Sequence, residues 1–187
     1  MAEYPNLTNQ FLIAMPALAD PNFFHSVTYI CQHNAEGAMG IVINQPLEIQ
    51  LGEVFEQMQI PVDNAATAEQ NVYLGGPVEQ ERGFILHDAP FDWEASLMVT
   101  DSVSVTSSRD ILSAMNAGSG PSNSLVALGY AGWAAGQLED ELVDNAWLTG
   151  PADTNIIFKM PSEQRWRAAA TLAGVDLSKL SDQVGHA

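Results

Sequence analysis

The side chains that could serve as metal ligands or acid–base catalysts are the four histidines His25, His33, His87 and His186. No two of them stand three or four residues apart, and the chain's one cysteine rules out a Cys-x-x-Cys motif. This pattern favours ordinary structural roles, although a site assembled across strands stays open. His87 ends a predicted strand that Arg82 precedes, and a spacing of five places their side chains on opposite faces of a regular strand. The two would share a site only if the turn curls back.

A second set of candidate ligands is the acidic group formed by Glu139, Asp140, Glu141 and Asp144. Carboxylates suit a hard divalent cation, but calcium loops also need a central glycine, which is absent here. The group falls early in a predicted short helix, where the helix dipole favours carboxylates without a metal. The sequence therefore favours a solvated acidic face, and we expect no metal and no cofactor.

Motifs for nucleophilic catalysis or nucleotide binding are missing. The chain has no Gly-x-Ser-x-Gly elbow, no Walker A sequence and no Gly-x-Gly-x-x-Gly loop. We assign no catalytic residue and expect a protein that is not an enzyme. An enzyme built from dispersed residues, such as His87 and Asp88, remains the alternative.

The stretch from Leu128 to Glu139 concentrates three glycines and two large aromatics at the end of an apolar run. Glycine lets backbone approach closely, and Tyr130 and Trp133 offer flat surfaces with a polar tip. Such a segment can build a ligand pocket or a tightly packed corner. The candidate ligand- or partner-binding residues are Gly75, Gly76, Arg82, His87, Tyr130 and Trp133.

Charge excludes one class of function. Six basic and 23 acidic residues give a net charge of −17, and no Lys or Arg precedes Arg82. Nucleic-acid binding needs basic side chains that meet phosphates, so we expect no direct DNA or RNA contact. We expect an unknown protein or small molecule as the partner.

Cysteine use and hydropathy point to the cytoplasm. The single cysteine, Cys31, excludes an internal disulfide and lies in an apolar run, where a buried inert thiol is expected. The N-terminus lacks the features of a signal peptide, and no apolar run reaches the roughly 20 residues that span a bilayer. We therefore expect a cytoplasmic protein without membrane contact.

Short β-type runs alternate with a few amphipathic helices, which must position these residues. Strands are predicted at 11–15, 26–31, 40–43, 72–74, 83–87, 102–106, 125–130 and 155–158. Helices are predicted at 51–59, after Ser107, at 137–143 and around 166–173. The strands at 72–74 and 83–87 are predicted neighbours, 63–70 is a predicted surface loop, and 102–106 is a predicted half-buried strand. The pattern favours one α+β domain over residues 1–187 with a large mixed sheet.

Several ordered motifs make the chain resemble the YqgE/AlgH family of bacterial proteins. They are Phe11-Leu12-Ile13-Ala14-Met15-Pro16, Asp20-Pro21-Asn22-Phe23, Gly37-Ala38-Met39-Gly40-Ile41-Val42-Ile43-Asn44, Gly75-Gly76-Pro77-Val78, Arg82-Gly83-Phe84-Ile85-Leu86-His87, Leu128-Gly129-Tyr130-Ala131-Gly132-Trp133 and Gly185-His186-Ala187.

The resemblance implies a single α/β domain whose mixed sheet curls into a partial barrel flanked by helices. It brings no agreed catalytic residues. Some family members are labelled transcriptional regulators, a label that conflicts with the charge of this chain as far as direct DNA contact is concerned. Indirect regulation through a protein partner stays open.

Overall fold

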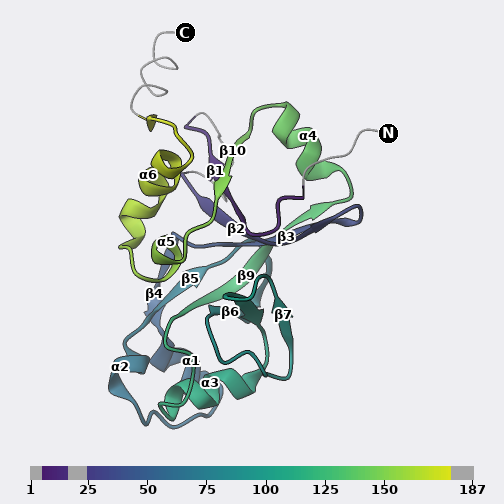
Figure 1. The fold of residues 1–187 in the computed structure, drawn as a ribbon. Helices are drawn as coiled ribbons and strands as arrows, with labels where there is room; N and C mark the ends of the chain where they lie inside the picture. The colour runs from purple at the N-terminus through teal and green to yellow at the C-terminus, as the bar shows by residue number, and fades with distance from the viewer. Residues whose placement is uncertain (1–5, 17–24, 178–187) are drawn as a thin grey trace.

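A computed structural model describes residues 6–16 and 25–177. The motifs at 20–23 and 185–187, and His186, lie outside these described residues. Within them the chain forms one ten-stranded sheet with helices on both sides, an α+β fold as predicted, and the sheet curls into a half-barrel (Figure 1).

The strands described by the structure are β1 (Gln10–Ala14), β2 (Val27–Asn34), β3 (Gly37–Val42), β4 (Pro46–Gln50), β5 (Asn71–Leu74), β6 (Val78–His87), β7 (Ser96–Met98), β8 (Ser104–Thr106), β9 (Ser124–Ala134) and β10 (Trp147–Pro151). The helices are α1 (Leu51–Gln57), α2 (Ala65–Ala68), α3 (Arg109–Asn116), α4 (Gln137–Val143), α5 (Thr154–Phe158) and α6 (Ser162–Leu172). The main strand order is β10-β1-β2-β3-β9-β6-β8-β7, and β5 joins β9 to β4.

Strand β9 connects the two halves of the sheet. Its first half runs parallel to β5, with Val72 opposite Val126, and its second half runs antiparallel to β3, with Gly40 opposite Ala131. Strand β6 pairs along its other edge. Along its length β9 therefore changes its partner from β5 to β3, and it passes through the middle of the molecule in Figure 1.

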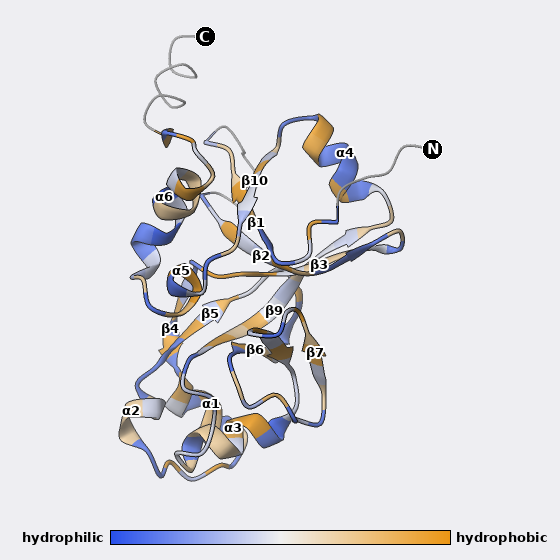
Figure 2. Cartoon of the chain, viewed as in Figure 1, coloured by the Kyte–Doolittle hydropathy of each residue, from blue (hydrophilic) through white to orange (hydrophobic). Residues whose placement is uncertain are grey.

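Three groups of buried apolar side chains fill the two sides of the sheet. The largest packs α5 and α6 against one face, and includes Phe11, Tyr29 and Ile157. The second group packs α1 and α3 against the opposite face, and the third packs α4 against that face. Figure 2 shows hydrophobic colour along the central strands and a mixture of hydrophobic and hydrophilic residues on α3 and α4. The alternation of side chains along each strand therefore feeds two cores at once.

The periodic segments were predicted well. Helix α4 has the predicted bounds and buries Leu138. The helix around 166–173 is α6, which buries Ala169 and Ala170 and is followed by Gly174 in the left-handed region.

Helix α5 corrects the prediction of a strand at 155–158. Asp153 caps it, because the side chain accepts a hydrogen bond of 2.7 Å from the backbone nitrogen of Asn155. A short apolar run does not distinguish strand from helix by itself, and this cap decides for the helix. A similar cap by Asn64 forms α2 inside the predicted loop 63–70.

Pairing and burial correct other predictions. Strands β5 and β6 are not neighbours, since both pair with β9 instead. Strand β8 is not half-buried, because Ser104 and Thr106 are as buried as Val105. The helix that follows begins one residue later than predicted, with Ser108 at its N-cap, and strands β4, β7 and β10 escaped prediction. These differences depend on partners distant in sequence.

Candidate functional site

A surface hollow of about 540 Å³ lies across β3, β9 and β6. Its border combines apolar, aromatic and charged side chains from all three strands. These residues are Ala38, Met39, Val78, Glu79, Arg82, Phe84, Tyr130, Gly132 and Trp133. We call this surface the Tyr130 hollow. It brings three predicted site residues, Arg82, Tyr130 and Trp133, to one border.

Tyr130 forms the aromatic floor of the hollow. It is half-buried, and its ring meets Phe84 edge-on at a centroid distance of 5.4 Å. Val78 stands opposite Tyr130 in the β6–β9 register and is 36% exposed. An exposed apolar side chain on a strand beside a half-buried aromatic ring forms a surface whose apolar area a partner can bury.

Arg82 is held at the rim by three neighbours. Its Nη2 donates a hydrogen bond of 3.0 Å to Ser107 Oγ, its Nη1 lies 3.8 Å from Glu79 Oε2, and its guanidinium carbon lies 5.3 Å from the centre of the Phe84 ring. Both members of the ion pair have side chains about half exposed, 52% and 51%. An exposed pair of this kind adds little stability, so it is available to an incoming group.

An irregularity in β6 positions this rim. Between the pairs Val78–Tyr130 and Gly83–Leu128, β6 has four residues where β9 has only Gly129. Glu79 at the start of the extra segment takes a left-handed φ of 49°. Bulges of this kind redirect side chains and are frequent beside functional sites.

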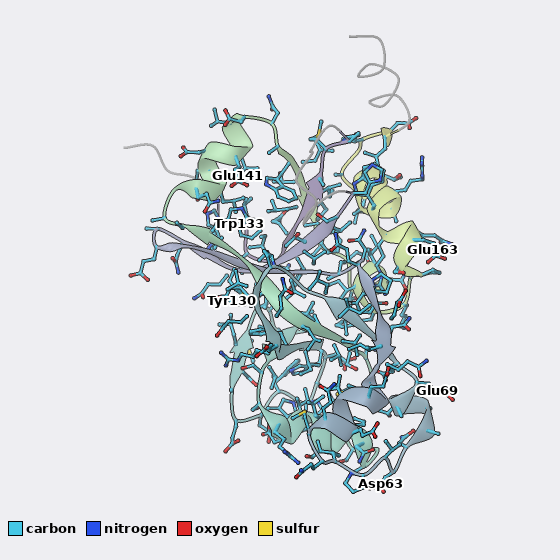
Figure 3. The ribbon with its side chains drawn as sticks, turned by 180° about the vertical axis from the view of Figure 1, so that it is seen from behind. Asp63, Glu69, Tyr130, Trp133, Glu141 and Glu163 are labelled. Carbon is cyan, nitrogen blue, oxygen red and sulfur yellow. The ribbon has the colours of Figure 1, made fainter. Side chains whose placement is uncertain are left out.

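Trp133 borders the hollow, but its indole belongs to the core. The side chain is only 6% exposed and packs against Trp147 at a centroid distance of 6.2 Å. Its Nε1 donates a hydrogen bond of 3.1 Å to Glu141 Oε1, which also accepts one of 2.9 Å from Trp147 Nε1. Figure 3 shows Trp133 on the side of the sheet that faces Glu141 and Tyr130 on the other side.

Gly75 and Gly76 lie behind the hollow and do not border it. The backbone nitrogen of Gly75 donates a hydrogen bond of 2.8 Å to Leu128 O, and its carbonyl accepts one of 2.8 Å from Val42. A Cβ at Gly76 would overlap the backbone of Tyr130, and a Cβ at Gly129 would overlap the carbonyl of Gly76. These glycines therefore let the β5–β6 turn pack directly on β9 and so position Tyr130.

His87 is separated from Arg82 and from the hollow. Its side chain is completely buried, and both ring nitrogens are engaged: Nδ1 donates to Asp88 O at 2.8 Å, and Nε2 accepts from Thr106 Oγ1 at 2.7 Å. Burial lowers the pKa of His87, partly offset by Asp88. The imidazole is therefore neutral at pH 7 and works as a bridge between β6 and β8.

The acidic group on α4 is not simply a solvated face. The buried carboxylate of Glu139 contacts Nε2 of His33. Nδ1 of the same imidazole accepts a hydrogen bond of 3.0 Å from the backbone nitrogen of Leu7. With Glu141 bonded to the two indoles, two of the four predicted solvated carboxylates anchor α4 to the sheet. Asp140 and Asp144 are exposed as predicted. The predicted helix at 137–143 gave no signal that Glu139 would be buried beside Leu138.

A second group, which the sequence predictions missed, surrounds the buried Arg165. It lies in α6 beside Tyr73 of β5 and borders a polar cavity. The signal was present in the sequence, because Arg165 stands four residues before the buried Ala169 and so shares its face of the helix.

Within 6–16 and 25–177, no group of three or more His, Cys, Asp or Glu side chains is arranged to hold a metal ion. Among the helices of the same described residues, none combines the length and the apolar character that crossing a bilayer requires.

Known proteins give close matches to this chain. The model of a family described as AlgH-like matches residues 11–178. The UPF0301 protein of Thioalkalivibrio sulfidiphilus is 60% identical over 187 residues, covering all of both chains, and that of Nitrosococcus oceani is 54% identical over 179 residues, covering 96% of each.

Two solved structures also match. The solution structure of the AlgH protein from Pseudomonas aeruginosa has 48% sequence identity and a TM-score of 0.81, covering 100% of this chain and 99% of that one. A crystal structure of a protein from Corynebacterium diphtheriae has a TM-score of 0.71 at 19% identity, covering 97% and 94%, and shows likeness of fold alone.

Proposed function

The chain belongs to the AlgH-like family, and from that premise we propose that it is a non-catalytic, cytoplasmic binding protein that acts on regulation through a protein partner. The partner docks on the Tyr130 hollow. The observation that carries this proposal is the exposed Val78 beside the half-buried ring of Tyr130 and a weak Arg82–Glu79 pair.

The shape of the hollow favours a protein over a small molecule. Small-molecule sites are usually enclosed and bury most of their ligand. The Tyr130 hollow instead lies on the open surface of three strands, with Val78 and Gly132 exposed. Its rim carries one acid and one base, so a partner with an apolar centre and charged edges fits it.

Two other functions have less support. Direct DNA binding would need a basic surface, and the hollow has Arg82 as its one base among the described lining residues, in a chain of net charge −17. An enzyme based on His87 and Asp88 would need an accessible base, and both nitrogens of His87 are buried and hydrogen-bonded.

A pair of matched variants tests the proposal. Val78→Asp puts a charge into the hollow, whereas Val143→Asp makes the same change on α4, where the side chain is 76% exposed. Each tagged variant is used to capture proteins from a bacterial lysate, and captured proteins are quantified by mass spectrometry against wild type. We expect a partner that wild type and Val143→Asp retain and that Val78→Asp loses by about tenfold or more, because the apolar contact would then bury a charge.

Thermal unfolding confirms that each variant is folded before capture. Equal capture by all three proteins would refute the Tyr130 hollow as the docking surface. A mobility-shift titration with DNA at low salt tests the competing function, and a saturable shift there would overturn the expectation of no direct DNA contact.

A further inference from the structure

A polar cavity of about 290 Å³ lies at the amino ends of the parallel strands β5 and β9, away from the Tyr130 hollow. Its walls come from β5, the start of β9, α5 and α6. Hydroxyl and amide groups dominate the lining, which includes Asn71, Tyr73, Asn123, Ser124 and Arg165. None of its described lining residues is Asp or Glu. This composition is unusual in a chain with 23 acidic and 6 basic residues.

Arg165 places a positive charge in the wall of this cavity. The residue is only 4% exposed, and its guanidinium carbon lies 5.1 Å from the centre of the Tyr73 ring. Nε donates a hydrogen bond of 2.9 Å to Met160 O, and Nη1 donates one to Ile43 O. Both acceptors are neutral carbonyls, so the hydrogen bonds satisfy donors but leave the charge without a counter-ion.

No carboxylate of the described residues forms an ion pair with this guanidinium within 4.0 Å. Tyr73 and, to a smaller degree, Glu163 favour the charged form of Arg165, but Glu163, two residues earlier on α6, is exposed and makes no ion pair with it. Burial itself lowers the pKa of Arg165, which expresses the cost of holding a charge away from water. Buried charges in proteins are normally paired for this reason.

We propose that this cavity binds the phosphate or carboxylate group of a small molecule, with Arg165 as its charge partner and the side chains of Asn71 and Ser124 as further hydrogen-bond donors. An anion there pairs the buried charge, and a guanidinium matches the geometry of both groups. An adjoining cavity of about 260 Å³ shares Asn123 and Phe158 with this one and gives room for the remainder of the ligand.

The binding of an anion is separable from the structural role of Arg165. Its hydrogen bonds tie α6 to Met160 and to Ile43 at the end of β3, so Arg165→Gln can weaken the fold as well as the site. Asn71→Asp avoids this difficulty. Asn71 is exposed at the start of β5, and the change keeps its size while adding a negative charge to the cavity.

Asn34→Asp is the matched control. Asn34 is exposed at the end of β2, its Oδ1 accepts a hydrogen bond of 2.8 Å from the backbone nitrogen of Glu36, and Asp can accept the same bond. The two variants therefore have the same net charge and differ in where the added charge lies.

The experiment titrates the full chain with inorganic phosphate and, separately, with acetate at constant ionic strength maintained with sodium chloride. Backbone amide shifts in NMR locate the site, and thermal unfolding measures stabilisation by bound anion. We expect one of the two anions to shift the amides at 70–73 and 122–125 and to raise Tm of wild type and Asn34→Asp alike. Asn71→Asp should bind about tenfold more weakly or worse, and Arg165→Gln should show no response.

Three results would overturn the proposal: neither anion shifts those amides, Asn71→Asp and Asn34→Asp bind equally, or a folded Arg165→Gln responds like wild type. If Arg165→Gln does not fold, the first two comparisons decide. A response to phosphate alone identifies the phosphate-bearing class, and a response to acetate alone the carboxylate class. Because the cavity is distant from the Tyr130 hollow, each outcome is independent of partner capture.

Discussion

Tyr130 and Trp133 lie three residues apart on β9 and point to opposite faces of the sheet. Tyr130 meets Phe84 at the floor of an open hollow, whereas Trp133 is packed against Trp147 and bonded to Glu141 beneath α4. An odd spacing on a strand produces this division. One aromatic segment therefore contributes both a surface and a core, and the two roles predict different effects of substitution.

Replacing Trp133 should damage stability more than replacing Tyr130. Trp133→Ala removes a buried indole and a hydrogen bond to Glu141, so we expect a loss of about 3–5 kcal/mol in the free energy of unfolding. Tyr130→Ala removes a half-buried ring and should cost about 1–2 kcal/mol. Urea denaturation of both variants measures the difference. Equal losses would mean that the two rings contribute alike to the core.

Among the glycines of β9, we expect Gly129 to tolerate substitution least. Its φ is 77°, and a Cβ there would overlap the carbonyl of Gly76 and crowd Val78 O at 3.0 Å. We expect Gly129→Ala to cost about 3 kcal/mol or more, from strain and backbone displacement together.

Gly136 supplies the control for that substitution. It has the same φ of 77°, and an added Cβ would have no heavy atom within 4 Å. Gly136→Ala should therefore cost only about 1 kcal/mol, the conformational part. Chemical denaturation of both variants separates close packing from strain, and a Gly136→Ala loss as large as that of Gly129→Ala would contradict the packing argument.

The buried His87 should make stability depend on pH. Because burial lowers its pKa in the folded protein, the unfolded chain binds a proton first on acidification. The stability that comes from keeping His87 neutral in the folded protein is complete above about pH 6.5, and it is lost as the pH falls from there to the lower pKa of the folded state. We expect His87→Gln to show a shallower fall in unfolding free energy between pH 7.5 and 5, by up to about 1.4 kcal/mol per pH unit.

His25 also has a pKa lowered by burial, so wild type and variant share that part of the pH dependence. The difference between the two profiles isolates His87. Parallel profiles would show that His87 does not titrate differently in the folded and unfolded chains.

Cys31 should resist thiol reagents in the folded protein. It is 2% exposed in β2, and burial raises the pKa of its thiol, which keeps the nucleophilic thiolate scarce. We expect labelling by Ellman's reagent at pH 8 to follow the rate of unfolding and to become complete in urea. Stoichiometric labelling within minutes under native conditions would contradict the burial of Cys31.

Local patterns explain which elements could be predicted. The spacing of Leu138 and Leu142 gave α4 with its bounds, and the alanine stripe before Gly174 gave α6. The segment at 155–158 was wrongly predicted as a strand because its apolar run is too short to show a period. The side-chain cap at Asp153 is the contact that makes it a helix. Strand β10 was missed because its pairing with β1 joins residues more than a hundred positions apart.

Local patterns also singled out some, but not all, of the residues at the candidate site. Tyr130 and Arg82 were singled out by residue type and do reach one hollow, whereas Gly75 and Gly76 support it from behind. His87 lies elsewhere, bonded to Thr106 of β8. Arg165 was overlooked although its spacing to Ala169 indicated a buried face, and its cavity could not be predicted because Tyr73 and the start of β9 are distant in sequence.

By itself the sequence determined the α+β class, most strands and helices, the strongly acidic charge and the family resemblance, because these follow from composition, short-range periodicity and motifs. Only the tertiary structure decided that β9 lies between β5 and β6 and then passes to β3. That pairing turns Tyr130 and Trp133 to opposite faces of the sheet and buries Trp133, and the packing of α6 buries Arg165 without a described counter-ion. Strand pairing and burial depend on contacts between segments that are distant in sequence, and such contacts leave no periodic pattern in a single sequence.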